Sequence, residues 1–348
     1  MGGTVETVLG PVSSDSLGRT LTHEHFALNF NKFYSPPPHY LSDKIGDEIT
    51  LQNVGILRQY PYSSKYNLKF YDQDTLAAVL NDVKHYKSYG GGTIVENTSI
   101  GLNRNLSFLK EVALNTGVNV VAGTGYYVSA VQNQNTLEMT KEQMYDKMLA
   151  DLTTGDSDIK CGFIGEVGSS WPIHDFEKRA IQATAIAQES TGCAVSFHPG
   201  RDRQAPFEIM RIFMEAGGNI QKTVMSHLDR TLQKTEDLLE FSDMGSYCQF
   251  DLFGTECSFY QLSPTADMPS DAQRIDSIVK LIEHGKTEKI LMSHDIHTKH
   301  RLEDFGGHGY SHLMNNVYPK MLIKGISQEI IDKITIINPK VWLERLSM

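Results

Sequence analysis

RTLTHEHF, residues 19–26, is the stretch that decides how this chain folds. In an extended strand alternate side chains share a face, so His23 and His25 would point the same way and could bind one metal ion. Four later apolar runs also end in a histidine or an acid: GFIGE (162–166), FHP (197–199), SHL (226–228) and SHD (293–295). Metal-binding side chains at the ends of hydrophobic strands, spread through the whole chain, indicate a metal centre at the mouth of a barrel.

The same arrangement of strand and helix repeats along the chain. Eight short apolar runs, mostly β-branched, are each expected to form a strand: 19–26, 92–98, 118–126, 161–168, 193–199, 223–229, 247–253 and 289–296. Helical periodicity follows at 73–89, 105–116, 140–152, 175–191, 204–217, 233–243 and 270–285. The alternation predicts an α/β fold, a (β/α)8 TIM barrel over residues 1–348 as a single domain, with the metal centre at the C-terminal ends of the strands. An open doubly wound sheet is the alternative, but it would not require acids and histidines at so many strand ends.

Residues 31–71 form the one long insertion in this pattern. It contains Pro36-Pro37-Pro38 and five tyrosines between Tyr34 and Tyr66. Because it follows the first strand, it is expected to lie over the barrel mouth as a lid or a partner surface, with a poorly packed loop as the alternative. The sequence leaves the oligomeric state open, a homo-oligomer included.

The composition excludes several classes of protein. A net charge of −10 with no basic stretch argues against a nucleic-acid binder. No apolar run approaches the roughly 18 residues that span a bilayer, so no membrane partner is expected. The four cysteines have no CxxC spacing, and the N-terminus lacks the features of a signal peptide. Buried, reduced thiols in a cytosolic protein are the plainest interpretation.

Six side chains at strand ends make up the expected metal centre: His23, His25, Glu166, His198, His227 and Asp295. Strand alternation would point Asp295 inward with Ser293, turn His294 toward the helices, and make Glu24 an outward-facing or supporting residue. A lone histidine of this kind is more often structural, but buried strand ends rarely tolerate several unpaired ionisable groups. Six ligands exceed one tetrahedral ion and suit two ions roughly 3.5–4 Å apart, with zinc the default for nitrogen and oxygen ligands.

These motifs resemble the phosphotriesterase branch of the amidohydrolase superfamily, and most closely its animal, phosphotriesterase-related subgroup. The resemblance extends in order across the whole chain, through TVLGPV, LGRTLTHEH, YSPPP, GGGTIVENT, KCGFIGEVG, HPGR, MSHLDRT, DLFGTE, HDIHTK and GGHGYSH. It implies that His23, His25, Glu166 and Asp295 surround one ion, and that Glu166, His198 and His227 surround the other.

One residue departs from the bacterial phosphotriesterases. Those enzymes bridge their metals with a carboxylated lysine on the fourth strand, where this chain has Glu166. Glutamate supplies a permanent carboxylate without carbon dioxide, but its stem is shorter, so the metals must lie nearer that strand or be bridged asymmetrically. This departure argues against efficient organophosphate hydrolysis and leaves metal binding intact.

The expected chemistry is attack by a metal-bridging hydroxide, with Asp295 as the proton shuttle. Cations in the loops after strands five, six and eight favour a small anionic substrate: Arg201, Arg203, Arg230, Lys299 and Arg301. Arg201 and Arg230 are the preferred substrate contacts, together with His308 from the glycine-rich loop at 306–309. The resemblance implies an amidase that hydrolyses N-acetyltaurine to taurine and acetate and, more weakly, N-acetyl amino acids.

Two other functions stay open on the residues alone. The same centre could hydrolyse a lactone or a phosphoester. A non-catalytic barrel that binds a metabolite or a partner and keeps its metals as structure is the alternative from another class, although structural metal sites are usually closed and mononuclear.

Overall fold

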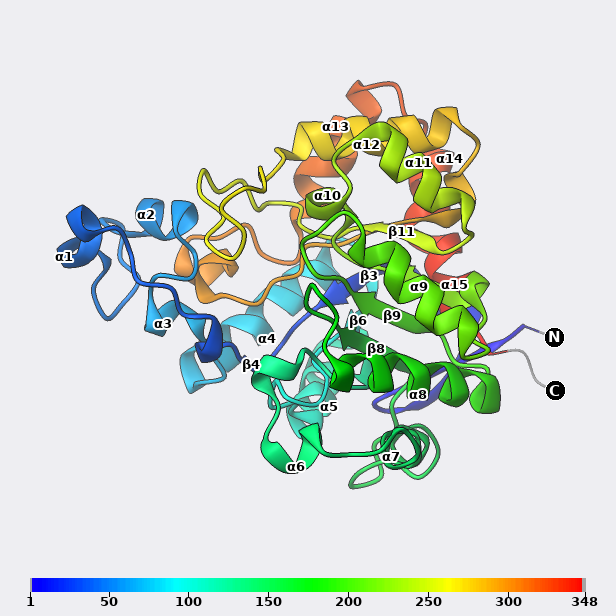
Figure 1. The fold of residues 1–348 in the computed structure, drawn as a ribbon. Helices are drawn as coiled ribbons and strands as arrows, with labels where there is room; N and C mark the ends of the chain where they lie inside the picture. The colour runs from blue at the N-terminus through cyan, green and yellow to red at the C-terminus, as the bar shows by residue number, and fades with distance from the viewer. Residues whose placement is uncertain (1, 346–348) are drawn as a thin grey trace.

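Eight parallel strands follow one another around a barrel in sequence order in the computed structural model, which describes residues 2–345 (Figure 1). They are β3 (Arg19–Glu24), β6 (Gly91–Glu96), β7 (Asn119–Thr124), β8 (Phe163–Gly168), β9 (Val195–His198), β10 (Thr223–Met225), β11 (Tyr247–Phe250) and β12 (Ile290–Met292). The last strand returns to the first: the His23 amide donates to Ser293 Oγ at 3.0 Å, and the Asp295 amide donates to the His23 carbonyl at 3.0 Å. The predicted (β/α)8 barrel is confirmed.

Helices occupy the connections between the strands (Figure 1). The seven predicted helices are α4 (Gln73–Ser88), α5 (Leu106–Thr116), α7 (Lys141–Thr153), α8 (Asp175–Thr191), α9 (Ala205–Glu215), α11 (Thr235–Asp243) and α12 (Asp271–Glu283). Local signals fix their ends: Thr140 and Gln143 form a capping box at the start of α7, and Gly192 ends α8 in the left-handed conformation at φ 65°. Shorter elements complete the fold. The hairpin of β1 (Thr4–Thr7) and β2 (Gly10–Ser13) precedes β3, α6 (Gln134–Leu137) and α10 (Leu228–Thr231) lie between strands, and α13 (Tyr318–Ile323), α14 (Gln328–Asp332) and α15 (Asn338–Leu343) follow β12.

Apolar side chains fill the N-terminal half of the barrel interior. Phe163, Val95, Val121 and Leu291 belong to one buried cluster that Trp342 of α15 joins. A second and larger cluster packs the outside of the strands against the helices. Because this interior core is apolar, polar side chains of the barrel interior are concentrated at the C-terminal ends of the strands.

Two strands contain irregularities around candidate ligands. In β8, Phe163 lies in the inner cluster and Ile164 in the outer one, so strict alternation would turn Glu166 outward. A register shift between Ile164 and Val167 breaks the alternation and brings Glu166 into the barrel. A similar shift between Leu21 and Glu24 in β3 contains His23, which faces the centre.

The insertion at 31–71 contains α1 (Ser42–Ile45), α2 (Val54–Gln59) and α3 (Lys65–Leu68), and β5 (Lys69–Phe70) pairs with β4 (Leu28–Asn29). It projects from the barrel beside the loops that follow β11 and β12 (Figure 1). Polar contacts tie it to those loops: the Tyr62 amide donates to Gln261 Oε1 at 3.0 Å in the loop after β11, and Tyr62 Oη lies 3.2 Å from His297 Nε2 in the loop after β12. The insertion therefore forms one wall above the barrel mouth.

The four cysteines are free and buried, as expected from their spacing. None of the helices formed by residues 2–345 has the length and apolar character to cross a membrane.

Candidate metal centre

Six side chains converge at the C-terminal end of the barrel, and all are at most 7% exposed. The sequence-predicted set is brought together completely: His23, His25, Glu166, His198, His227 and Asp295. The rings of His23 and His25 lie 5.5 Å apart between centroids, and those of His23 and His227 lie 4.9 Å apart. Side chains from five different strands or their following loops thus face one small volume.

Glu166 lies between His25 on one side of this cluster and His198 and His227 on the other. Its Oε1 is 3.6 Å from His25 Nε2, while its Oε2 is 3.0 Å from His198 Nδ1 and 3.5 Å from His227 Nε2. Oε2 also lies 3.6 Å from His23 Nε2, so the carboxylate reaches histidines on both sides of the cluster, as a bridging ligand would.

Asp295 closes the cluster on the side of β12. Its Oδ1 lies 3.1 Å from His25 Nε2 and 3.5 Å from His23 Nε2, and its Oδ2 lies 3.2 Å from His297 Nδ1. Burial by itself raises the pKa of Asp295, but His297 and His25 together hold it well below its usual range. The carboxylate is therefore ionised at neutral pH, free to bind a cation or to accept a proton.

Three of the six residues, His25, His227 and Asp295, lie just beyond the ends of their strands. β10 ends at Met225 and β12 at Met292, and both His227 and Asp295 adopt left-handed backbone conformations, with φ of 57° and 55°. Such conformations are costly for residues other than glycine and concentrate at functional sites. The expectation that Asp295 faces inward and His294 outward holds, but a loop turn produces it where strand alternation was expected.

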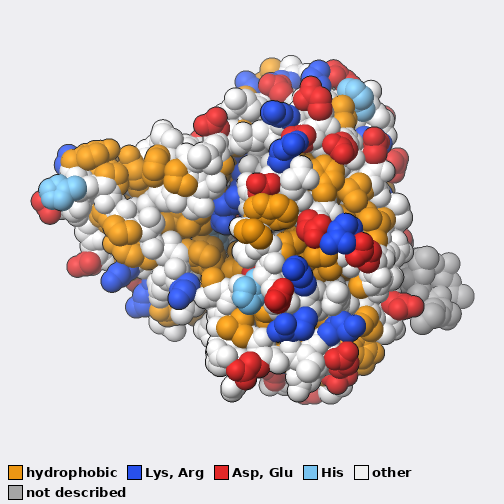
Figure 2. Space-filling model, viewed as in Figure 1, with side chains coloured by type: hydrophobic (Ala, Val, Ile, Leu, Met, Phe, Trp, Pro, Cys, Tyr) orange, Lys and Arg blue, Asp and Glu red, His pale blue; other side chains and the backbone are white. Residues whose placement is uncertain are grey.

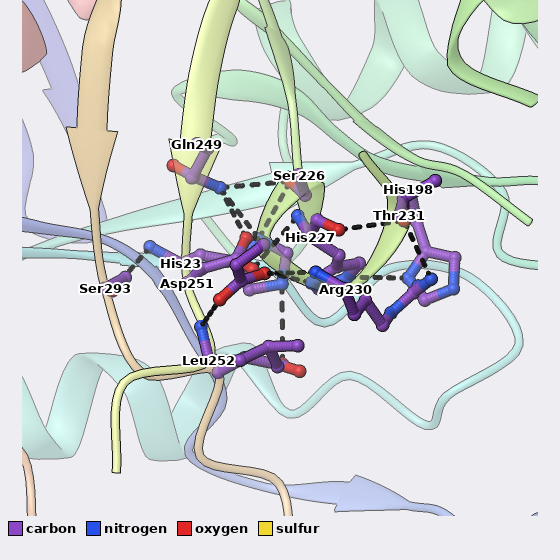
Figure 3. A network of polar contacts seen from close by, with 12 residues as sticks. His23, His198, Ser226, His227, Arg230, Thr231, Gln249, Asp251, Leu252 and Ser293 are labelled. Carbon is purple, nitrogen blue, oxygen red and sulfur yellow. Dashed lines mark hydrogen bonds and ion pairs between the residues drawn. The ribbon is translucent and has the colours of Figure 1, made fainter. Parts of the chain in front are cut away.

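Asp251, just after β11, organises the imidazoles and was missed from the sequence. Its Oδ1 accepts hydrogen bonds from the His227 amide at 3.0 Å and from His227 Nδ1 at 2.7 Å, and its Oδ2 lies 3.4 Å from His23 Nδ1 (Figure 3). Gln249 donates to Asp251 Oδ2 at 2.8 Å and to Ser226 Oγ at 3.0 Å. A carboxylate behind two imidazoles fixes their orientation and directs their Nε2 atoms toward the centre.

Other carboxylates support the cluster from outside it. Thr98 Oγ1 lies 2.9 Å from His25 Nδ1 and donates to Glu96, which also accepts from the Phe26 amide. Glu24 faces away from the centre, as the sequence suggested, and it pairs with His294 at 2.7 Å. Glu96 holds the residue that follows His25, and Glu24 ties the end of β3 to the segment after β12.

The donor set fits divalent metal ions. His23 Nε2 is buried and has no hydrogen-bond partner within residues 2–345, although it faces Glu166 and Asp295. Burial lowers the pKa of His23 to about 4 and that of His227 to about 3, so both rings present neutral lone pairs. Burial and then the charges of Asp295 and Asp251 raise the pKa of Glu166 well above its ordinary value. A cation bound among these groups would give the His23 nitrogen a partner and would offset the repulsion between the carboxylates.

A cavity of about 430 Å³ opens above the cluster, between the barrel and the insertion. Its floor includes His25, Glu166, His198, His227 and Asp295, and aromatic walls come from Phe30, Tyr62, Tyr127 and Tyr260. Figure 2 shows the face on which the insertion meets the barrel, with basic side chains at the boundary between them. The volume suits a small organic substrate.

The candidate substrate contacts and the other loop cations differ in whether they line the cavity and in whether they are bound to other groups of the protein. Arg201, Arg230 and His308 all line the cavity. Two further loop cations, Arg203 and Lys299, do not line the cavity. Arg203 is exposed and pairs with Asp237 at 3.0 Å, and Lys299 is paired with Asp72. A third, Arg301, lines the cavity, but its guanidinium donates to the carbonyls of His294, Asp295 and Phe253. In the sequence, a cation that follows a strand end looks the same whether it binds another group of the protein or contacts the substrate.

The sequence profile of the phosphotriesterase family matches residues 3–343. The chain belongs to the phosphotriesterase family. Phosphotriesterase-related protein from Aedes aegypti is 55% identical over 350 residues, and that from Drosophila melanogaster is 54% identical over 344 residues, with 98% of each chain covered in both comparisons. The expected relation to this animal subgroup is confirmed.

Solved structures agree with this assignment. A resiniferatoxin-binding protein from Rhodobacter sphaeroides matches 98% of this chain and 95% of its own, with a TM-score of 0.93 and 28% identity. The phosphotriesterase homology protein from Escherichia coli, solved with phosphate in its active site, shares the fold with a TM-score of 0.77 and 23% identity, over 95% of this chain and 100% of its own. The chain is a hydrolase of the phosphotriesterase family whose histidines and acids could hold divalent metal.

Proposed function

We propose that the protein is a binuclear metal-dependent amidase that hydrolyses small anionic N-acyl substrates, with N-acetyltaurine preferred and N-acetyl amino acids turned over more weakly. One observation carries this proposal. Arg201 and Arg230 line the same cavity as the imidazole and carboxylate cluster, in a chain whose net charge is −10. A cationic wall beside a metal-type centre favours a substrate that carries a carboxylate or sulfonate.

The six-residue cluster is expected to hold two divalent ions, with His23, His25, Glu166 and Asp295 around one and Glu166, His198 and His227 around the other. Zinc is the ion that such nitrogen and oxygen ligands favour. When bound, the ions would lower the pKa of a water and polarise the acyl carbonyl of the substrate.

Asp295 has the position to move the proton that this reaction releases. Its ionised carboxylate borders the cavity and can accept a proton from the attacking water. When the amide C–N bond breaks, the same carboxyl can return that proton to the leaving nitrogen, because an unprotonated amide anion is a very poor leaving group. The products of N-acetyltaurine hydrolysis would then be acetate and taurine.

The two arginines offer different contacts to the anionic end of the substrate. Arg230 is 4% exposed, and its Nη2 donates to the Pro199 carbonyl at 3.2 Å, which holds it beside His198. Arg201 donates through Nε to Tyr260 Oη at 2.9 Å, and its terminal nitrogens make no hydrogen bond within residues 2–345. Arg201 can therefore present both terminal nitrogens to a sulfonate or carboxylate.

The direct test is hydrolysis by purified protein loaded with Zn²⁺ after chelator treatment. N-acetyltaurine would be compared with N-propylacetamide, which has a similar length and no charge, with an N-acetyl amino acid, a lactone and a phosphotriester. We expect the highest kcat/KM for N-acetyltaurine and loss of turnover on chelation with the fold retained. Preferred turnover of the lactone or phosphotriester would replace the amidase proposal, and metal binding without any turnover would indicate a binding barrel.

A further inference from the structure

Three side chains of types that can bind metals lie together on the outside of the barrel, away from the cavity. Asp82 and His85 lie one turn apart on α4, and Glu303 begins the short 3-10 turn Glu303–Phe305 in the segment after β12. Each residue offers one ligand atom, and these atoms all lie within 4.8 Å of one another. His85 Nδ1 and Glu303 Oε2 are 2.6 Å apart. Positions i and i+3 share a helix face, so α4 presents both of its side chains to the same point.

The buried member of this cluster lacks a full set of partners. Asp82 is 0% exposed, and its Oδ1 makes no hydrogen bond within residues 2–345, while its Oδ2 accepts from the Glu303 amide at 3.2 Å. Burial raises the pKa of Asp82 to about 8; the hydrogen bond from the Glu303 amide opposes this rise, and the charges of Glu303 and Asp304 add to it. Buried carboxylates are usually paired or bound to metal, and no lysine or arginine of the described chain forms an ion pair with Asp82.

The backbone around Gly309 closes the cluster on its inner side. Gly309 has φ +63°, and a Cβ at this position would lie 2.7 Å from Glu303 Oε1 and 3.0 Å from Asp82 Oδ2. Any larger residue at position 309 would therefore occupy the space beside the two carboxylates. The preceding residue, His308, lines the active-site cavity, so the cluster and the cavity share one loop as a common wall.

We propose that Asp82, His85 and Glu303 bind a divalent transition-metal ion that fastens α4 to the segment following β12. Two carboxylates and one imidazole suit Zn²⁺ or Mn²⁺ better than Ca²⁺ or Mg²⁺, which prefer oxygen ligands alone. Since His85 and Glu303 are partly exposed, water can complete the coordination. This site is separate from the barrel centre and does not rest on the proposed function.

Binding there would stiffen the support of the active site. The Gly309 amide donates to the Arg301 carbonyl at 2.9 Å, and Arg301 donates in turn to the Asp295 carbonyl at 2.6 Å. An ion held by Glu303 would restrain the same segment from its outer side.

The experiment measures Zn²⁺ bound per chain by equilibrium dialysis against buffered free Zn²⁺, over a range that saturates the wild type. His85→Ala and Glu303→Gln should each bind one equivalent fewer than the wild type. Asp304→Asn is the matched control, because Asp304 lies beside Glu303, bonds Asn81 and is not one of the three ligands. It should bind the same amount as the wild type. Each result is a difference from the wild type, so it does not depend on how many ions the barrel centre holds.

A second readout is thermal stability. Added Zn²⁺ should raise the melting temperature of the wild type and of Asp304→Asn by a few degrees more than that of His85→Ala, since only the former two gain the extra ligand interaction. His85 is exposed, so its replacement should leave the fold intact. Equal Zn²⁺ content in all variants would overturn the proposal and leave Asp82 as a protonated carboxyl. An equal loss in Asp304→Asn would overturn it in favour of diffuse binding to an acidic surface.

Discussion

Asp251→Asn should have opposite effects on metal affinity and on the stability of the metal-free protein. The carboxylate aligns His227 through two hydrogen bonds and faces His23 from behind. The amide keeps the size of the side chain but supplies only one acceptor oxygen and no charge. Loss of a supporting carboxylate behind a ligand histidine typically weakens metal binding by about 10–100-fold, which is about 1.4–2.7 kcal/mol.

Without metal, the same carboxylate costs stability. Burial raises the pKa of Asp251 to about 6 from an ordinary value of 3.8, with the charge of Asp295 adding to the rise and His23 opposing it. The folded state therefore holds this proton up to a higher pH than the unfolded state does. The free energy of unfolding then falls as pH rises through the window from about 4 to 6, by on the order of 3 kcal/mol at about 1.4 kcal/mol per pH unit. The asparagine side chain of the variant, like a protonated carboxyl, carries no charge and avoids this loss.

The assay is denaturant unfolding of chelator-treated wild type and Asp251→Asn at pH 4.5 and pH 7.5, together with Zn²⁺ affinity measured by competition with a chelator. At pH 7.5 the metal-free variant should be at least as stable as the wild type, and the difference should shrink at pH 4.5. Its Zn²⁺ affinity should nevertheless be lower. The reasoning is refuted if the metal-free variant is markedly less stable at pH 7.5, or if its affinity equals that of the wild type.

Three further predictions concern the ligands and the substrate contacts. Glu166→Gln should lose bound metal, because a neutral amide is a poor bridge, and bicarbonate during reconstitution should change neither wild-type activity nor wild-type metal content; a variant that keeps two ions by metal analysis would remove Glu166 from the bridge. Asp295→Asn should lower kcat by at least roughly 10²–10⁴ in a steady-state assay, the range of general acid–base catalysis, and wild-type turnover would contradict its role as proton shuttle. Arg201→Ala should raise KM for N-acetyltaurine and leave KM for a neutral N-acyl amide nearly unchanged. The control Arg203→Ala, which removes an exposed arginine paired with Asp237, should change neither KM. Equal losses on charged and neutral substrates would assign Arg201 to folding.

The barrel could be predicted from the sequence because its signals are local. Each strand is a short apolar run, and each helix has its own periodicity and caps, as at Thr140 and Gly192. The convergence of the six candidate ligands could be predicted for a related reason. A histidine or acid that ends an apolar run must leave the core at the strand's C-terminal end, and in a parallel barrel all such ends lie together.

The geometry that completes the site could not be predicted in this way. The register shift around Glu166 and the left-handed conformations of His227 and Asp295 have no signature in the local sequence pattern. Asp251 was within reach, because it is an acid that directly follows an apolar strand run. Six candidate ligands already suffice for two metal ions, and a supporting carboxylate has the same sequence signature as a ligand.

The charges of the site explain why its support is so extensive. Glu166, Asp251 and Asp295 lie within one buried cluster; the charges of Asp295 and Asp251 raise the pKa of Glu166, and that of Asp295 also raises the pKa of Asp251. In the absence of a cation these carboxylates repel one another, and burial keeps His23 and His227 neutral, so those two rings do not compensate. The fold must therefore hold an unfavourable arrangement in place before metal binds, which it does with an apolar barrel floor beneath the cluster and hydrogen bonds behind it. Because bound cations would relieve the same repulsion, metal affinity and stability in this protein should be coupled through these three carboxylates.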